Sequence, residues 1–321
     1  MRRFQPGNKP GSFVMDCKAA LLEFLGTTTF LLLGLGGIQA GAAALGHPSP
    51  DSPPSILMLM YIAMSMGLSL LVSAWLFYRI TGGLFNPNVS LGLLLTGVIG
   101  PVRFVLYVIA QIVGGIAAAG LVRGLTGMPL ASNTRLSAQT SLAQGVFIEM
   151  FITAALVLSV LMLAAEKHVA TPFAPVGVGL TLFVGHLFAV FYTGASMNTA
   201  RSFGVAAVTG FPDGHHWIYW LGPTLGSLLA AGIYSLLVHH QYWLLNPNQD
   251  TDNPHHSPDD PVVRAKAAVS GQQIERHEAE GQGPRNSLNT NNDQKPATTG
   301  STSGPAMNGG YNRREKGGSP V

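Results

Sequence analysis

The sequence predicts an all-α membrane protein, with six transmembrane helices plus two re-entrant half-helices in an inverted repeat. The first observation is composition: of 321 residues, 47% are hydrophobic and only 10% are charged, whereas an ordinary soluble domain has roughly a quarter charged. The second is a set of long apolar runs. The third is a pair of short segments that repeat each other 112 positions apart. Together these observations predict a protein built within a lipid bilayer.

Six apolar runs are each long enough to cross a bilayer, which takes about 20 helical residues for ~30 Å of hydrocarbon. They cover residues 17–45, 56–78, 102–123, 141–164, 173–193 and 216–240. The first run is too long for a cleavable signal peptide and follows a polar arm, so we expect it to be the first span. An even number of spans places both termini on the same side of the membrane.

Basic residues indicate which side, because Lys and Arg near the ends of spans favour the cytoplasm. The ends predicted to be cytoplasmic contain Arg2, Arg3, Lys9, Lys18, Arg79, Lys167, Arg264 and Lys266. The loops after the first and fifth spans contain no Lys or Arg except Arg201, which we place inside the membrane. Arg123 and Arg135, near the third loop, run against the pattern. We therefore expect both termini in the cytoplasm.

Two segments begin like helices but have about half the length of a span. "GLFNPNVSLGLLLTG" (Gly83–Gly97) has Asn86 at a helix N-cap and Pro87 in the first helical position. "ASMNTARSFGVAAVTG" (Ala195–Gly210) repeats this pattern with Asn198. About ten residues reach ~15 Å, so two such helices end to end would cover ~30 Å and complete a seventh span. Irregular backbone at this depth must lie inside the protein or beside water, which predicts that both Asn caps face a polar path.

An internal repeat relates the two halves of the chain. The pairs Thr81 and Thr193, Gly82 and Gly194, Asn86 and Asn198, Ser90 and Ser202, and Tyr107 and Tyr219 are each separated by 112 positions. Each half has three spans, so the second copy must enter the membrane from the opposite side, which makes the repeat inverted. Inverted repeats place their working site at the bilayer midplane, where discontinuous helices meet. Two ordinary capped loops at the membrane surface, the alternative interpretation, would not share a single offset.

The sequence also predicts what lies outside the spans and which kinds of site to exclude. Residues 1–16 are expected to form a cytoplasmic N-terminal arm, 17–245 the membrane domain, and 246–321 a disordered cytoplasmic tail with few large apolar residues. The single cysteine, Cys17, allows no intrachain disulfide and no cysteine-based metal site. The net charge of +3 comes from scattered residues, which gives no support for nucleic-acid binding. No pair of nucleophile and base, metal cluster or phosphate loop is recognisable, so we expect no enzyme, catalytic residue, metal or cofactor.

The half-helix motifs resemble those of the aquaporin (major intrinsic protein) family, whose half-helices each open with Asn-Pro-Ala. Here the motifs are "NPN" (Asn86, Pro87 and Asn88) and "NTA" (Asn198, Thr199 and Ala200) followed by "RS". The resemblance covers about residues 15–243, and the stretches "TGASMNTARSFG" and "AEKH" are most similar to fungal orthodox aquaporins. It implies six tilted helices around one pore, packed as a homotetramer.

By this resemblance, the narrow selectivity filter of the family would fall on Met66, His186, Ala195 and Arg201. The usual His and Arg of the filter are both present, whereas Met66 stands where the family commonly has an aromatic residue. An Arg inside a membrane is costly and is by default functional, so Arg201 would donate hydrogen bonds to water and repel cations. His186 lies in the apolar stretch "FVGHLFAVF", so we expect its ring to face the interior and narrow the pore.

The resemblance implies a passive water channel that excludes protons and ions, with a single-file pore in each protomer. Four residues match the water-channel pattern rather than the glycerol-channel pattern of the family: Ser202, Ala206, Tyr219 and Trp220. Two alternatives stay open, namely a channel for another small neutral solute such as hydrogen peroxide or glycerol, and a non-conducting membrane scaffold. The expected partners are water, small neutral solutes and membrane lipid, and the expected location is the plasma membrane.

Two buried carboxylates and two departures from the family pattern complete the predicted site. Glu23 and Glu149 occupy equivalent places in the repeat, where they would either relay protons or, as in the family, accept hydrogen bonds from the re-entrant loops. Thr199 replaces the family's Pro and Asn88 replaces its Ala. In the family these positions touch across the pseudo-two-fold axis. Because an unpaired amide at that depth costs several kcal/mol, we predict an Asn88–Thr199 hydrogen bond.

Overall fold

The structure is a computed structural model. It describes residues 12–46 and 55–247, together with residues 249, 251, 261, 262, 266 and 269. Residues 1–257 and 258–321 form two separate units, and the description below concerns the first. Most of the predicted tail (246–321) and most of the predicted N-terminal arm (1–16) lie outside the described residues. Their disorder and their place in the cytoplasm stay predictions.

Eight α-helices form the described part of the first unit. They are α1 (Ser12–Ala44), α2 (Ile56–Phe77), α3 (Pro87–Leu95), α4 (Pro101–Thr126), α5 (Leu142–Val160), α6 (Ala174–Thr193), α7 (Thr199–Thr209) and α8 (Ile218–His239). A π-helical turn, Leu161–Ala165, extends α5, and the 3₁₀ turns η2 (Thr171–Phe173) and η3 (Tyr242–Leu244) precede α6 and follow α8. Each predicted span contains one of the six helices that are long and apolar enough to cross a membrane, which confirms the predicted fold class. The first helix begins at Ser12, so its first turn lies in the segment predicted as an arm.

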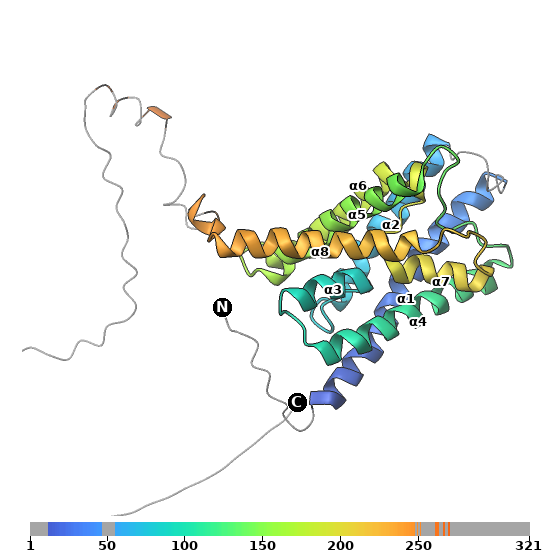
Figure 1. Cartoon of the computed structure of the whole chain (residues 1–321), viewed down its shortest axis with the longest axis horizontal. Coiled ribbons are helices and arrows are strands. Elements are labelled where there is room, and N and C mark those ends of the chain that lie inside the picture. Colours follow the sequence, from blue (N-terminus) through green and yellow to red (C-terminus); the bar gives the residue numbers. More distant parts are fainter. Residues whose placement is uncertain are drawn as a thin grey trace, which may run out of the picture. The chain divides into compact units, whose positions relative to one another are not determined.

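The two half-helices are present, and each is about half as long as the spans around it. Helix α3 has 9 residues and α7 has 11, against 22 in α2 and in α8. Both begin directly after an Asn in extended conformation, Asn86 and Asn198. Figure 1 shows α3 and α7 as short helices lying among the long ones.

The long helices pack in pairs that follow the repeat, with α1 against α4 and α5 against α8. Each half-helix contacts a span from the other half of the repeat: α3 contacts α8, and α7 contacts α4. The backbones of α7 and α4 approach each other closely, because a Cβ added at Gly204 would lie 2.3 Å from the carbonyl carbon of Gly115. Small residues allow such close approach of backbones in membrane proteins.

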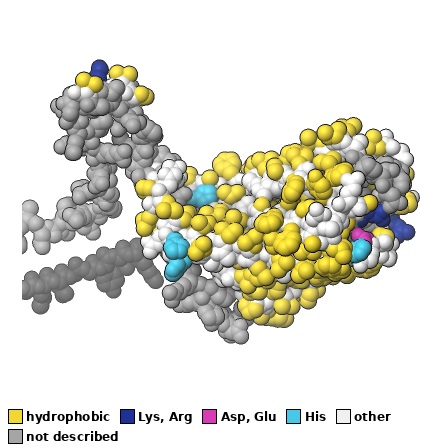
Figure 2. Space-filling model, turned by 45° about the horizontal axis from the view of Figure 1, so that its top comes forward, with side chains coloured by type: hydrophobic (Ala, Val, Ile, Leu, Met, Phe, Trp, Pro, Cys, Tyr) yellow, Lys and Arg dark blue, Asp and Glu magenta, His cyan; other side chains and the backbone are white. Residues whose placement is uncertain are grey.

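The surface of the spans is apolar, as lipid contact requires. Large hydrophobic side chains are exposed along every span; on α2 they include Leu57, Met64, Leu68 and Trp75. In Figure 2 hydrophobic side chains cover the body of the visible face, and the charged and His side chains gather at its ends. A soluble protein rarely exposes so large an apolar patch, so this surface fits hydrocarbon rather than water.

Candidate functional site

The candidate site lies where the N-termini of the two half-helices meet. The side-chain oxygen of Asn86 accepts a hydrogen bond from the Asn88 N–H at 2.9 Å. The side-chain oxygen of Asn198 accepts from the N–H groups of Ala200 at 2.9 Å and Arg201 at 3.3 Å. Each Asn therefore caps its own half-helix, as the sequence predicts, and its amide nitrogen is free to bind elsewhere.

The amide nitrogens of the two caps bind the opposite half of the repeat. Asn86 Nδ2 donates to the Met197 carbonyl at 2.7 Å, and Asn198 Nδ2 donates to the Phe85 carbonyl at 2.9 Å. Phe85 and Met197 precede the two caps and both adopt a left-handed backbone, with φ of 53° and 52°. Such strain in buried non-glycine residues persists only where the surroundings hold it. Here it turns each carbonyl toward the other half-helix and links the two motifs.

The two buried carboxylates hold the re-entrant loops. Glu23 Oε1 accepts from the Phe85 N–H at 2.6 Å. Glu149 Oε1 accepts from the Ser196 N–H at 2.9 Å and from Thr193 Oγ1 at 2.6 Å, while Glu149 Oε2 accepts from the Met197 N–H at 2.9 Å. The contacts predicted for Glu23 and Glu149 are thus present, and they fix the strained residue that precedes each Asn cap.

Gln111 is a residue of this framework that the sequence alone did not indicate. Its amide donates to Glu23 Oε1 and to Ser90 Oγ, both at 2.9 Å. It therefore ties α4 to α1 and to α3. In the sequence Gln111 is only an isolated amide within an apolar span, and this pattern does not indicate which residue it binds.

The predicted contact between Asn88 and Thr199 is confirmed. Thr199 Oγ1 lies 2.9 Å from Asn88 Oδ1, and it also lies 3.0 Å from the Tyr219 carbonyl. The structure adds a second bond, because the Thr199 backbone N–H donates to the same Asn88 oxygen at 3.0 Å. Pro would lack this N–H, so Thr199 brings a buried donor to the junction and Asn88 supplies its acceptor.

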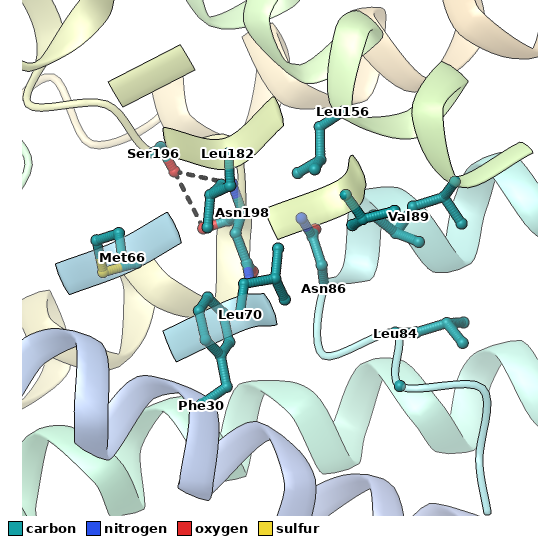
Figure 3. A pocket seen from close by; sticks show the side chains of 13 residues that line it. Phe30, Met66, Leu70, Leu84, Asn86, Val89, Leu156, Leu182, Ser196 and Asn198 are labelled. Carbon is teal, nitrogen blue, oxygen red and sulfur yellow. Dashed lines mark hydrogen bonds between the residues drawn. The ribbon is translucent and has the colours of Figure 1, made fainter. Parts of the chain in front are cut away.

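A small cavity, with a volume of about 20 Å³ open to water, lies beside the two Asn caps. Its polar lining comes from Asn86, Asn198 and Ser196, and Met66 belongs to its otherwise mainly apolar lining. Figure 3 shows the side chains of Asn86 and Asn198 near the middle of the view, with Met66 farther out beside Asn198 and with Leu70 and Phe30 below the two caps. The remaining motif residues, Pro87, Asn88, Thr199 and Ala200, are buried but do not line the cavity.

The other predicted filter residues, His186, Ala195 and Arg201, are buried and do not line this cavity either. His186 Nδ1 lies 2.9 Å from the Leu182 carbonyl, and Arg201 Nη1 donates to the Ser132 carbonyl at 2.9 Å. His186 Nε2 and Arg201 Nε are buried without a hydrogen-bond partner among the described residues. The two side chains are near enough to interact electrostatically. The structure thus places His186 and Arg201 near each other, and each has one buried polar atom without a partner among the described residues. Their role as a filter stays a prediction.

This geometry places two polar Asn caps beside an otherwise mainly apolar cavity within a bundle of membrane-spanning helices. The positive ends of two half-helix dipoles meet at the Asn caps, where they oppose cations. The described residues contain no group of three or more His, Cys, Asp or Glu side chains that could hold a metal ion. Six membrane-spanning helices around two re-entrant half-helices and a central cavity define a membrane channel.

Comparison with known proteins gives the same class. A family model described as "Major intrinsic protein" matches residues 12–234. An aquaporin of Laccaria bicolor is 63% identical over 79% of this chain and 82% of its own length, and aquaporin-1 of the same organism is 62% identical with the same coverage. The solved structure of the aquaglyceroporin from Plasmodium falciparum has a TM-score of 0.57 at 22% identity, covering 73% of this chain and all of that one, and so supports the fold. The chain belongs to the major intrinsic protein (aquaporin) family, and it is similar to fungal aquaporins. Members of this family are channels, not enzymes.

Proposed function

We propose that the protein is a passive water channel that excludes protons and ions, with one single-file pore in each protomer. The observation that carries this proposal is the meeting of both Asn caps at one cavity. Asn86 and Asn198 each have one amide hydrogen engaged, with Met197 and Phe85, while both line the cavity. A water molecule passing here meets two donors within an otherwise mostly apolar wall, which suits the transit of single molecules.

Exclusion of protons and cations follows from the same arrangement. Two half-helix N-termini point their partial positive charge at the centre of the cavity. Donors on both sides force the oxygen of a passing water toward the Asn caps, so a continuous donor-to-acceptor chain of waters is interrupted. The buried charge of Arg201 adds a second barrier to cations.

Selectivity among neutral solutes is assigned to Met66, His186, Ala195 and Arg201. The buried imidazole and guanidinium narrow the path and offer His186 Nε2 and Arg201 Nε as hydrogen-bonding groups. Ala195, which is fully buried with a left-handed φ of 49°, adds only a methyl group to the proposed filter. Water meets both the size limit and the hydrogen-bonding demand.

A second candidate function is passage of another small neutral solute, such as hydrogen peroxide or glycerol. The observation that favours it is Met66, whose thioether lines the cavity at the position where an aromatic ring is usual in the family. Met is unbranched and adaptable, so it defines the pore width less strictly than a ring. A non-conducting scaffold is the third possibility.

The membrane placement of the protein follows from its charges and its family. We place both termini in the cytoplasm, the protein in the plasma membrane, and four copies in a homotetramer surrounded by lipid. Residues 17–245 then form the channel domain, and 1–16 and 246–321 form the cytoplasmic arm and tail.

Osmotic shrinkage of liposomes containing the purified protein, followed by stopped-flow light scattering, tests the water-channel proposal. We expect these liposomes to shrink several-fold faster than empty ones. Met66→Trp should remove most of the increase, because its bulk fills the cavity. Met64→Trp is the matched control, since Met64 is on the same helix but 45% exposed toward lipid. Shrinkage no faster than that of empty liposomes would favour the scaffold.

A further inference from the structure

The chain that follows α8 carries an exposed apolar segment which the channel does not use. Helix α8 ends at His239, and Gln241 then adopts a left-handed conformation with φ of 51°. The 3₁₀ turn Tyr242–Leu244 follows at once. The next side chains stand out from the protein, with 45% of Trp243, 65% of Leu244 and 81% of Leu245 exposed.

Polar contacts mark the level at which the neighbouring helices end. The hydroxyl of Tyr78, just past the end of α2, donates to the Ala164 carbonyl at 3.3 Å. The hydroxyl of Tyr234 on α8 donates to Glu166 Oε1 at 2.5 Å. Glu166 and Lys167 are charged residues of the loop between α5 and α6, and they place this level at the boundary of the hydrocarbon.

Helix α8 continues beyond that level. It runs on from Tyr234, at that level, to its end at His239. At a rise of 1.5 Å per residue this part of the helix is roughly 8 Å long. The headgroup zone on each side of the hydrocarbon is about 5–7 Å thick. The end of α8 therefore reaches about the outer edge of the lipid headgroups, and Figure 1 shows this orange end of α8 reaching past the loop that follows α5.

Tyr242 is less exposed than the apolar residues that follow it. The Tyr242 ring is half-buried and packs edge-on against Trp243, with ring centroids 5.4 Å apart. On α8 itself, Leu228 and Leu236 are 48% and 59% exposed, so apolar side chains are exposed up to the last turn of the span. The left-handed residue Gln241 then changes the direction of the chain before Trp243.

We propose that Trp243, Leu244 and Leu245 form a lipid anchor, which inserts into the headgroup boundary and holds the start of the C-terminal tail against the membrane. Trp is enriched at this boundary because its ring is apolar and its N–H is polar. Partly inserted apolar residues at the edge of the acyl chains bind in proportion to their buried area. Lipid is the occupant because these exposed apolar side chains follow, within the chain, directly on a membrane-spanning helix whose own exposed side chains are apolar.

Fluorescence quenching of Trp243 tests the anchor, and it does not depend on what the pore conducts. The chain contains 4 Trp residues, namely Trp75, Trp217, Trp220 and Trp243. The full-length protein and its Trp243→Phe variant are placed in liposomes with phospholipids brominated either near the headgroup or deep in the acyl chain. The difference between the two proteins reports Trp243. We expect strong quenching by the shallow label, weak quenching by the deep label and little quenching by aqueous iodide.

Trp75→Phe is the matched control, because Trp75 is 51% exposed on the lipid side of α2 and its loss should also reduce quenching by brominated lipid. Replacement of Leu244 and Leu245 by Ser, with Trp243 retained, should shift the Trp243 signal from lipid quenching to iodide quenching. Quenching of Trp243 by iodide in the unaltered protein would overturn the proposal. So would protection from both quenchers, which would indicate a protein contact instead.

Discussion

The imidazole of His186 illustrates how a buried side chain can be held by one atom and available at another. Its Nδ1 lies 2.9 Å from the Leu182 carbonyl one turn back on α6, while Nε2 has no partner among the described residues. The first contact orients the ring, and the second nitrogen is the group that the proposed filter would present to a solute. Arg201 has the same character, with Nη1 bound to the Ser132 carbonyl and Nε unpaired.

Replacement of His186 by Gly should admit glycerol. The change removes the ring that narrows the proposed filter, so glycerol uptake into proteoliposomes should rise several-fold while water permeability is retained. Stopped-flow light scattering under an inward glycerol gradient measures the effect. Phe188→Ala is the matched control, since Phe188 is on the same helix and 53% exposed. Glycerol uptake that stays at the wild-type rate would place the constriction elsewhere.

Replacement of Arg201 by Val should admit cations or larger neutral solutes, because it removes both a fixed charge and side-chain bulk. Flux of protons, read with a dye trapped in liposomes, and uptake of urea measure the two effects. Arg201→Lys retains the charge and should keep cations out better than Arg201→Val does. Equal ion exclusion by the wild-type and Val proteins would contradict a filter at Arg201.

At the scale of elements, the two half-helices are joined by hydrogen bonds that cross the repeat. The Asn86 and Asn198 amides bind the opposite loop, and Ser227 Oγ on α8 donates to the Asn88 carbonyl at 2.8 Å. At the equivalent place in the other half, Gly115 has no side chain and its backbone approaches the Ala200 carbonyl instead. The same junction is therefore closed by a hydrogen bond on one side and by close packing on the other.

The Asn88–Thr199 contact predicts a compensated pair of substitutions. Asn88→Ala leaves the Thr199 N–H without its acceptor, and Thr199→Pro leaves the Asn88 oxygen without either donor. Each single change should cost on the order of 1–3 kcal/mol. The double change restores the apolar pair of the family and should return thermal stability in detergent to near the wild-type value, because contacting residues are not additive. Additive losses would show that the two sites are independent.

The packing of α7 on α4 predicts that Gly204→Ala is destabilising. The added Cβ would lie 2.3 and 2.4 Å from the carbonyl carbon and oxygen of Gly115, and backbone atoms cannot move aside as a flexible side chain can. Overpacking of this kind costs about 1–3 kcal/mol. Gly232→Ala on α8 is the matched control, since no atom lies within 4 Å of the added Cβ there. Equal melting temperatures for the two variants would contradict the close contact.

At the scale of the whole molecule, the distribution of sulfur predicts resistance to mercurials. The chain has 1 Cys, and Cys17 is exposed near the start of α1, away from the cavity lining. Mercuric ion should therefore leave water permeability unchanged. Ala195→Cys should introduce inhibition, because it places a thiol at the proposed filter. Strong inhibition that survives Cys17→Ser, or an Ala195→Cys variant that stays insensitive, would contradict the assignment.

The fold could be read from the sequence because its signals are local and regular. Each span is an apolar run of sufficient length, and the hydrocarbon allows a helix as almost the only way to satisfy its backbone. The offset of 112 positions between Asn86 and Asn198 revealed the half-helices and their inverted relation. The Asn88–Thr199 bond also followed, because the family resemblance places these two residues in contact and a buried amide must be paired.

The sequence by itself determined the spans, the repeat, the caps and the pairing of the two motifs, and it pointed to the family. Only the tertiary structure showed that the Thr199 N–H and hydroxyl share the Asn88 oxygen and that Gln111 donates a hydrogen bond to Glu23. It also showed that Phe85 and Met197 have a strained backbone. It also decided which side chains line the cavity, among them Phe30, Leu70 and Leu182. These residues come from different helices and are typical of any apolar span. Their place depends on how each helix is rotated and packed, and no local pattern along the chain encodes that.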